Sequence, residues 1–169
     1  TQMLALSRAE TATPVLLRAE MDWPPIVEQV MSDCLELANR RRIELACQWP
    51  AAMRPPLPLI GDVHLVTVLL RNLVDNAVRY APVGSTVTLR LGCEQIEVEN
   101  AGGPLSPEQL ATLGQRFHRP PGQEEGGSGL GLSIAQRIAA LHGLEIVYDA
   151  GQSGAAVRAV LRFIRPTSP

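Results

Sequence analysis

Apolar residues recur with a helical period in three parts of the chain. The spacing predicts helices over residues 23–42, from about 63 to 80, and over 132–143. Asp62 offers an N-cap for the middle helix and Pro82 ends it. The apolar stripe of the middle helix forms one broad arc made of Val66, Leu69, Leu70, Leu73, Val74, Ala77 and Val78.

Strands are predicted between these helices, where apolar and polar residues alternate. The predicted strands are residues 15–22, 43–49, 85–92 and 94–100, and a closing hairpin of 144–150 and 155–164. A long loop is predicted over 118–131, after a short helix that begins near Ser106. Because several strands are hairpin-connected, the order favours an α+β fold over a doubly wound parallel sheet. We expect a two-layer α/β sandwich, with a mixed sheet and helices on one face.

Composition narrows the class of protein. The chain has 169 residues, 46% of them hydrophobic, which suits one domain with a core. It has no apolar run of about 18 residues, and its three cysteines are far apart, so we expect a reducing cytoplasm. The net charge is -2 and the only basic cluster is Arg40–Arg42, so no nucleic-acid partner is expected. All 15 basic residues are arginine, which excludes any mechanism that needs a lysine of this chain.

Two asparagines stand in the middle of the longest predicted helix. Asn72 and Asn76 are one turn apart, and Arg79 lies beside them on one edge of the apolar arc. A buried amide without a hydrogen-bond partner costs about 1 to 3 kcal/mol. One reading is that both amides are half exposed or bond to a neighbouring loop. The pair with its arginine favours a ligand, because amide oxygens suit Mg²⁺ and arginine suits phosphate.

A glycine-rich segment directly precedes the last predicted helix. Its glycines stand at positions 122, 126, 127, 129 and 131. Bared N–H groups that lead into a helix N-terminus form an anion site. A Walker loop is excluded by the missing lysine, and a dinucleotide fingerprint would need GxGxxG after a strand. Taken alone, the segment also fits a flexible loop that binds nothing.

The motifs together resemble a known family. The chain carries an Asn-x-x-x-Asn helix, then "VENAGGPLS", "RFHRP" and "GSGLGLSIAQRIAALHG". This order resembles the N, G1, F and G2 boxes of the ATP-binding catalytic domain of sensor histidine kinases, in particular the QseC- and PmrB-like group. The resemblance covers about residues 14–164. It implies a Bergerat-type sandwich that binds ATP with Mg²⁺.

The resemblance also implies roles for individual residues. Asn72 and Asn76 would form the catalytic pair, with Asn76 as the Mg²⁺ ligand and a lid over about residues 118–128. The implied nucleotide-binding residues are Asn72, Asn76, Arg79, Tyr80, Asn100, Gly102, Phe117, Arg119, Gly127, Ser128, Gly129, Leu130, Gly131 and Leu132.

The sequence departs from the family at two points. Asn100 stands where the G1 box usually has an aspartate, and the loss of a charge-assisted hydrogen bond predicts ATP affinity lowered by about 1 kcal/mol. No segment resembles the family's phosphoacceptor region. His64, His118 and His142 are each expected to be structural, so the acceptor histidine is expected outside this chain.

The implied function is transfer of the ATP γ-phosphate to a histidine on a dimerisation domain, for relay to a response regulator aspartate. Residues 1–13 are expected to end the dimerisation helix, 14–165 to form the ATP-binding domain, and 166–169 to be a tail. The full-length protein would be a homodimer in the bacterial inner membrane with this domain in the cytoplasm, and the fragment a monomer. Two alternatives stay open, a catalytically weakened regulatory module of the same fold and a gyrase- or Hsp90-like ATPase.

Overall fold

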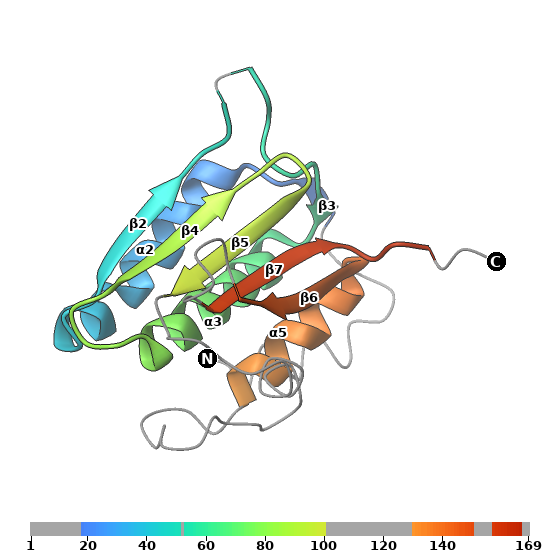
Figure 1. The fold of residues 1–169 in the computed structure, drawn as a ribbon. Coiled ribbons are helices and arrows are strands. Elements are labelled where there is room, and N and C mark those ends of the chain that lie inside the picture. Colours follow the sequence, from blue (N-terminus) through green and yellow to red (C-terminus); the bar gives the residue numbers. More distant parts are fainter. Residues whose placement is uncertain (1–17, 52, 101–129, 151–156, 167–169) are drawn as a thin grey trace.

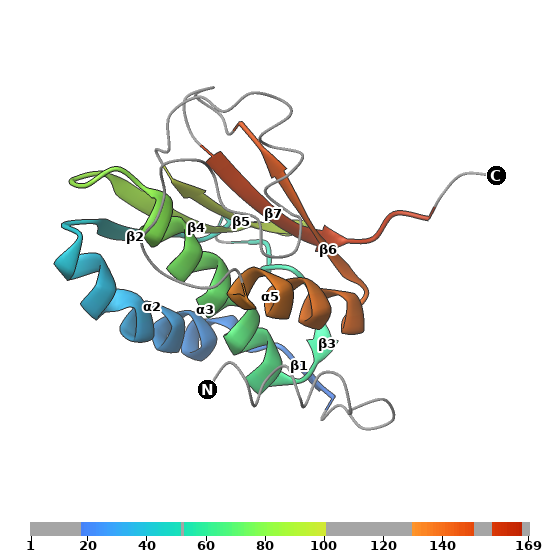
Figure 2. The same ribbon diagram turned by 90° about the horizontal axis from the view of Figure 1, so that it is seen from below.

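The residues that the structure describes form two layers, a five-stranded sheet and three helices that cover one face of it (Figure 1, Figure 2). This computed structural model describes residues 18–51, 53–100, 130–150 and 157–166. The helices are α2 (Trp23–Arg40), α3 (Val63–Tyr80) and α5 (Leu130–Leu141). The strands of the large sheet are β2 (Glu44–Gln48), β4 (Thr86–Leu91), β5 (Gln95–Asn100), β6 (Leu144–Asp149) and β7 (Val157–Phe163).

The sheet is mixed, as the sequence predicted. Its strand order is β2-β4-β5-β7-β6. The pair β2 and β4 is parallel because the chain crosses between them through α3, whereas the other neighbouring pairs are antiparallel. The predicted hairpin of β6 with β7 is confirmed. The α+β prediction with helices on one face is therefore confirmed.

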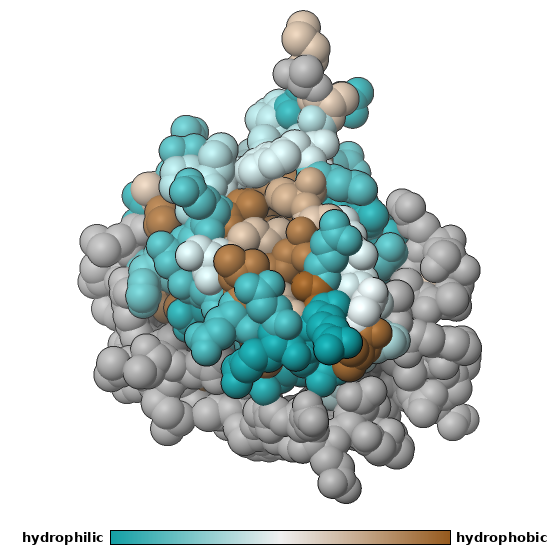
Figure 3. Space-filling view, turned by 90° about the vertical axis from the view of Figure 1, so that its left-hand side faces the viewer, coloured by the Kyte–Doolittle hydropathy of each residue, from teal (hydrophilic) through white to brown (hydrophobic). Residues whose placement is uncertain are grey.

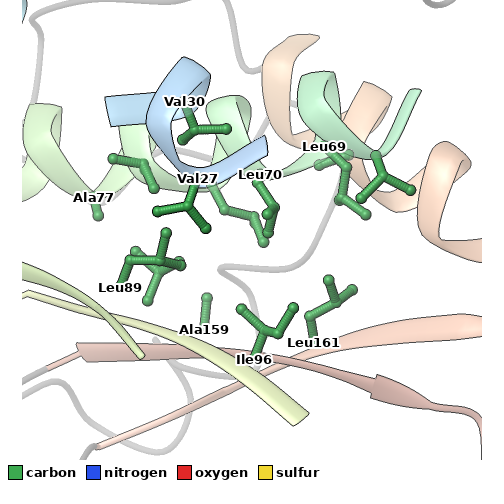
Figure 4. Packing of buried hydrophobic residues seen from close by; sticks show 14 of the residues in the cluster. Val27, Val30, Leu69, Leu70, Ala77, Leu89, Ile96, Ala159 and Leu161 are labelled. Atoms are coloured by element: carbon green, nitrogen blue, oxygen red, sulfur yellow. The ribbon is translucent and has the colours of Figure 1, made fainter. Parts of the chain in front are cut away.

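The core lies between the two layers. All seven arc residues predicted for α3 are buried. Alternate residues of β4 and β5 face the helices, for example Leu89 and Ile96, which are fully buried. Figure 4 shows residues of α2 and α3 packed against residues of the sheet, with labels on Val27, Val30, Leu69, Leu70, Ala77, Leu89, Ile96, Ala159 and Leu161.

The opposite face of the sheet carries charged side chains in cross-strand pairs. Arg158 of β7 donates hydrogen bonds to Asp149 of β6, at 2.7 and 2.8 Å, and to Glu97 of β5. Arg90 of β4 also pairs with Glu97, at 3.3 Å. On the far edge, Arg162 pairs with Glu145 at 3.0 Å. These charged side chains are thus paired with one another across the strands.

The side of the molecule formed by β2 and α2 has both apolar and polar surface. In Figure 3 apolar residues gather in the middle of this side and polar residues surround them. The half-buried apolar side chains that these two elements pack against the core are Met31, Leu37, Leu45 and Cys47.

Helix α3 is fixed at both ends. At its start the Asp62 carboxylate accepts a hydrogen bond from Leu65 N at 3.1 Å, which confirms the predicted N-cap. At its end Ala81 is extended before Pro82. The Arg41 guanidinium donates to the Val78 and Ala81 carbonyl oxygens at 3.0 and 2.9 Å. One residue of the arginine cluster thus caps the end of α3.

Three details differ from the prediction. The expected strand 15–22 is reduced, in the described residues, to β1 (Ala19–Glu20), which pairs with the unpredicted β3 (Ile60–Gly61) in a separate two-stranded sheet. A strand of two residues is too short to show the alternation by which strands are recognised in a sequence. Helix α5 begins at Leu130, so the prediction of a loop through 131 was wrong at its end.

In the described part of the chain, no helix is long and apolar enough to cross a membrane.

Candidate functional site

The two asparagines of α3 differ in burial. Asn72 is only 3% exposed, on the same arc as the apolar residues, and Asn76 is half-buried one turn later. The helix packs against α2, α5 and β5, so this arc faces the space between the layers. A half-exposed position is therefore wrong for Asn72, because its amide lies inside the core-facing surface of the helix.

Arg79 lies on the same helix and is held by a neighbour. Its Nε donates to the Asp75 carboxylate at 2.9 Å, one turn earlier. Both side chains are about 30% exposed, so the guanidinium keeps access to solvent. One turn before Asp75, Arg71 lies 3.8 Å from Asp33 of α2. The arginine predicted to contact phosphate is thus oriented by a carboxylate at the edge of the helix.

Asn100 ends β5 on the side of the sheet that faces the helices. It pairs in register with Val87 of β4 and with Val157 of β7. The residue is 5% exposed, and its Nδ2 has no hydrogen-bond partner within the part of the chain that the structure describes. Most buried polar atoms of native proteins are hydrogen-bonded, so such an atom needs an explanation.

Two tyrosines lie near each other beside this space. Tyr80 ends α3 and is half-buried, and Tyr148 of β6 faces the helices from the register position opposite Ala159. Burial raises the pKa of the Tyr148 hydroxyl, and the neighbouring Tyr80 raises it further. The hydroxyl oxygen is buried with no hydrogen-bond partner in the described ranges. Sequence reasoning missed Tyr148, although the alternation of Leu144, Ile146 and Tyr148 was a signal for it.

The G2 residues are described only in part. Leu130 and Gly131 open α5, and Leu132 in its first turn is buried. Because α5 packs on α3, its first turn lies on the same layer as the asparagines. The remaining predicted site residues lie outside the described residues, namely Gly102, Phe117, Arg119, Gly127, Ser128 and Gly129.

His142 has a structural role, as expected. Its Nε2 accepts a hydrogen bond from Asp62 N at 3.0 Å. Its Nδ1 lies 2.8 Å from the Ile138 carbonyl oxygen, which can only accept, so Nδ1 carries the proton and the ring is neutral. The ring also fills the space beside Gly61, where a Cβ would lie 2.1 Å from its Cδ2. His142 therefore joins the end of α5 to the start of α3.

A separate hollow lies on the other half of α3. It measures about 890 Å³ and lies between α2 and the first turns of α3, with Arg18, Gln29, His64 and Arg71 in its lining. His64 is exposed there at the helix start. None of the predicted nucleotide-binding residues lines this hollow.

The fold and site define a class of protein that a comparison with known families confirms. The family model described as "Histidine kinase-, DNA gyrase B-, and HSP90-like ATPase" matches residues 61–165. The chain therefore belongs to this family. The matched residues include α3 with its asparagines, β5 with Asn100, and α5.

Individual relatives point to one branch of the family. The chain is 38% identical over 153 residues to the sensor protein QseC of Escherichia coli (strain K12), which covers 90% of this chain and 33% of that protein. A solved structure titled "Structure of the cytoplasmic segment of histidine kinase QseC" has 27% identity and a TM-score of 0.66, and covers 98% of this chain and 89% of that one. The sensor-like histidine kinase SenX3 of Mycobacterium tuberculosis (strain ATCC 25618 / H37Rv) is 32% identical over 148 residues, which covers 83% of this chain and 35% of that protein. The chain thus spans about a third of the length of these relatives and is homologous to the catalytic domain of sensor histidine kinases.

Proposed function

We propose that this chain binds Mg-ATP between α3 and α5 and presents the γ-phosphate to a histidine on a helical dimerisation domain of the same kinase. The observation that carries the proposal is the set of amides on the inner side of the two layers. Asn72 is buried in the core-facing arc of α3, Asn76 stands one turn further, and Asn100 holds a buried amide at the end of β5. A buried amide without a hydrogen-bond partner in the described residues, such as that of Asn100, costs stability, so a ligand is the best reason for keeping it there.

The residues present suit magnesium. Mg²⁺ prefers hard oxygen ligands and keeps several waters, so one or two protein oxygens together with phosphate oxygens are sufficient. The Asn76 amide oxygen would be the protein ligand, with Asn72 beside the phosphates. When bound, the ion would offset the negative charge of the phosphates. Arg79, held by Asp75, would add a second positive charge.

No residue of this site needs to act as a base. A neutral imidazole nitrogen of the partner would form the N–P bond while the bond from the γ-phosphorus to the bridging oxygen breaks and ADP leaves. Such a loose transition state depends on positioning and charge stabilisation. Asn72 is an amide and cannot activate water as a carboxylate would, so we expect slow ATP hydrolysis by the chain alone.

The wider assignments follow from the family and remain proposals. Residues 14–165 would form the ATP-binding domain, 1–13 would end the dimerisation helix, and 166–169 would be a tail. The full-length protein would be a membrane-anchored homodimer that passes phosphate to a response regulator, as a two-component sensor does. The chain alone would be monomeric.

A phosphotransfer assay tests the proposal. The chain is mixed with γ-labelled ATP, Mg²⁺ and a separately purified helical domain that carries the acceptor histidine from a relative. We expect label on that domain with the wild-type chain and none with Asn76→Ala. The matched control Asn39→Ala changes an exposed asparagine of α2 and should keep full transfer. Transfer that survives in Asn76→Ala would overturn the role of Asn76.

Asn100 favours one second candidate, a regulatory module that binds nucleotide without transferring phosphate. An amide in place of the family's aspartate weakens the charge-assisted contact with the nucleotide. In that case the wild-type chain would bind Mg-ATP, and the acceptor domain would stay unlabelled in the same assay. A gyrase-like ATPase is disfavoured by Asn72.

A further inference from the structure

The buried amide of Asn100 offers a hydrogen-bond donor that no described residue of the protein accepts. Its Nδ2 has no partner within the described residues, and the side chain is 5% exposed. An aspartate at this position would present two acceptor oxygens and no donor, whereas asparagine presents one acceptor and two donors on a side chain of nearly the same shape. The substitution therefore changes what kind of ligand edge this position can match.

The described strand residues on the same face of the sheet as Asn100 carry no negative charge. On the helix-facing side of the sheet, the described strand residues are apolar except for Asn100, Tyr148 and the thiol of Cys47. Burial raises the pKa of the Tyr148 phenol, so it stays neutral at physiological pH. The small Ala159 is the register partner of both Val98 and Tyr148, which leaves only a methyl group on β7 between them. The carboxamide of Asn100 and the hydroxyl of Tyr148 can each donate or accept a hydrogen bond.

The two common kinds of purine differ at positions 1 and 6, the edge to which a carboxamide or carboxylate at position 100 would hydrogen-bond. Adenine presents a donor at N6 and an acceptor at N1. A 6-oxopurine, as in guanine or hypoxanthine, presents an acceptor at O6 and a donor at N1. A carboxylate matches the N6 donor and repels O6. A carboxamide can match either edge with two hydrogen bonds, because a half-turn of the amide exchanges its oxygen and nitrogen.

We infer that Asn100 broadens the base specificity of this site, so that it accepts 6-oxopurine nucleotides as well as adenine nucleotides. The inference rests on the proposed function, because it needs the base of a bound nucleotide to reach Asn100. The donor for O6 is Nδ2, and the acceptor for N1–H is Oδ1. With adenine the amide is turned over, so that Oδ1 accepts from N6–H and Nδ2 donates to N1, and neither kind of base leaves the amide donor unused.

Inosine triphosphate is the sharpest probe. It has O6 and N1–H but lacks the 2-amino group of guanine, so it changes only the edge that faces Asn100. Dissociation constants for Mg-ATP and Mg-ITP are measured by calorimetry with the wild-type chain and with Asn100→Asp. Asn39→Asp adds the same charge at an exposed position of α2 and is the matched control.

In the wild type we expect ITP to bind within about tenfold of ATP, since both bases satisfy the amide. In Asn100→Asp the preference for ATP should rise by at least about tenfold, because the carboxylate opposes O6. Asn39→Asp should keep the wild-type ratio. The ratio of the Mg-ITP and Mg-ATP dissociation constants in the wild type needs no variant. It therefore tests whether the site accepts 6-oxopurines even if Asn100→Asp fails to fold.

Two results would overturn the inference alone. One is ATP binding with ITP weaker by more than about 30-fold in the wild type, and the other is a ratio that a folded Asn100→Asp leaves unchanged. In both cases ATP still binds and the proposed function stands. If neither nucleotide binds the wild-type chain, the proposed function fails, and the inference fails with it.

Discussion

The two ends of α3 use their polar side chains differently. At the N-terminal end, Asp62 caps the helix and its N–H donates to His142, which in turn donates to Ile138 of α5. Each of these groups bonds within the protein. The C-terminal half carries Asn72, Asn76, Arg79 and Tyr80, of which Arg79 is bonded to Asp75. The contrast lies in Asn100 of β5, which faces the same layer and whose Nδ2 has no partner in the described residues.

We propose that this difference separates residues that build the fold from residues that serve a ligand. A satisfied buried polar group stabilises one arrangement of the elements, and its loss is felt in folding. A buried polar group without a hydrogen-bond partner, such as the Asn100 amide in the described residues, lowers the stability of the protein. The N-terminal end of α3 should therefore respond to mutation in stability, and the C-terminal end in nucleotide binding.

The largest expected effect is on binding. Asn76→Ala should weaken Mg-dependent ATP binding by at least about 100-fold, which is about 3 kcal/mol, because it removes the proposed protein ligand of the ion. The free energy of unfolding should change by less than about 1 kcal/mol, since alanine is the better helix former. Calorimetric titration and urea unfolding measure the two quantities. Wild-type affinity for Mg-ATP in this variant would contradict the prediction that mutations at the C-terminal end of α3 act on nucleotide binding.

At the other end, Gly61→Ala should lower the free energy of unfolding by about 2 kcal/mol. The new Cβ would lie 2.1 Å from Cδ2 of His142, so the ring must move and lose its bond to Asp62 N. Urea unfolding measures the loss. In the His142→Ala background the same glycine change should cost much less, because the ring is gone, and equal costs in both backgrounds would refute the clash.

Asn100→Leu should change stability and ATP binding in opposite directions. Leucine has a similar shape and leaves no buried donor unused, so the free energy of unfolding should rise by about 1 kcal/mol. ATP binding should weaken in the same protein, because the base loses its hydrogen-bonding partner. Thermal unfolding and calorimetry on one preparation give both numbers. A fall in stability would show that the amide already has a structural partner.

Asn100→Asp should tighten ATP binding by about 1 kcal/mol, or about fivefold. The carboxylate restores a charge-assisted acceptor for the adenine amino group. Competition against a fluorescent ATP analogue measures the change. Equal or weaker ATP binding by the aspartate variant would reject the predicted cost of the asparagine.

The smallest effect is expected for Asp75→Asn. The pair with Arg79 is about 30% exposed on a helix surface, so its loss should cost stability only about 0.5 kcal/mol. If Asp75 orients Arg79 toward phosphate, ATP affinity should fall by a few-fold as well. Asp75→Glu, which keeps the charge, should restore part of that affinity. An unchanged affinity in Asp75→Asn would limit the carboxylate to a structural role.

Much of the fold could be predicted because its elements carry long, regular patterns. The stripe on α3, the Asp62 cap and the alternation of β4 and β5 depend on local spacing, and the structure confirms them. The pair β1 and β3 has two residues in each strand and is fixed by contacts between distant parts of the chain, which spacing does not reveal.

The site was predictable to a different extent. The helix pattern predicted Asn72 and Asn76 as site residues, because two amides one turn apart are unusual beside a core, and the resemblance to the family's G1 box added Asn100. They did not identify Tyr148, whose place beside Tyr80 follows from the register of β6 with β7. Nor did the triplet of arginines show that Arg41 reaches the end of α3, since that contact joins two helices.

A structure of the chain with Mg²⁺ and a non-hydrolysable ATP analogue tests the central claim most directly. We expect a metal ion about 2.1 Å from the Asn76 amide oxygen and the purine edge in hydrogen-bond contact with Asn100. A nucleotide lodged instead in the hollow between α2 and the first turns of α3, or bound with its metal away from Asn76, would contradict it.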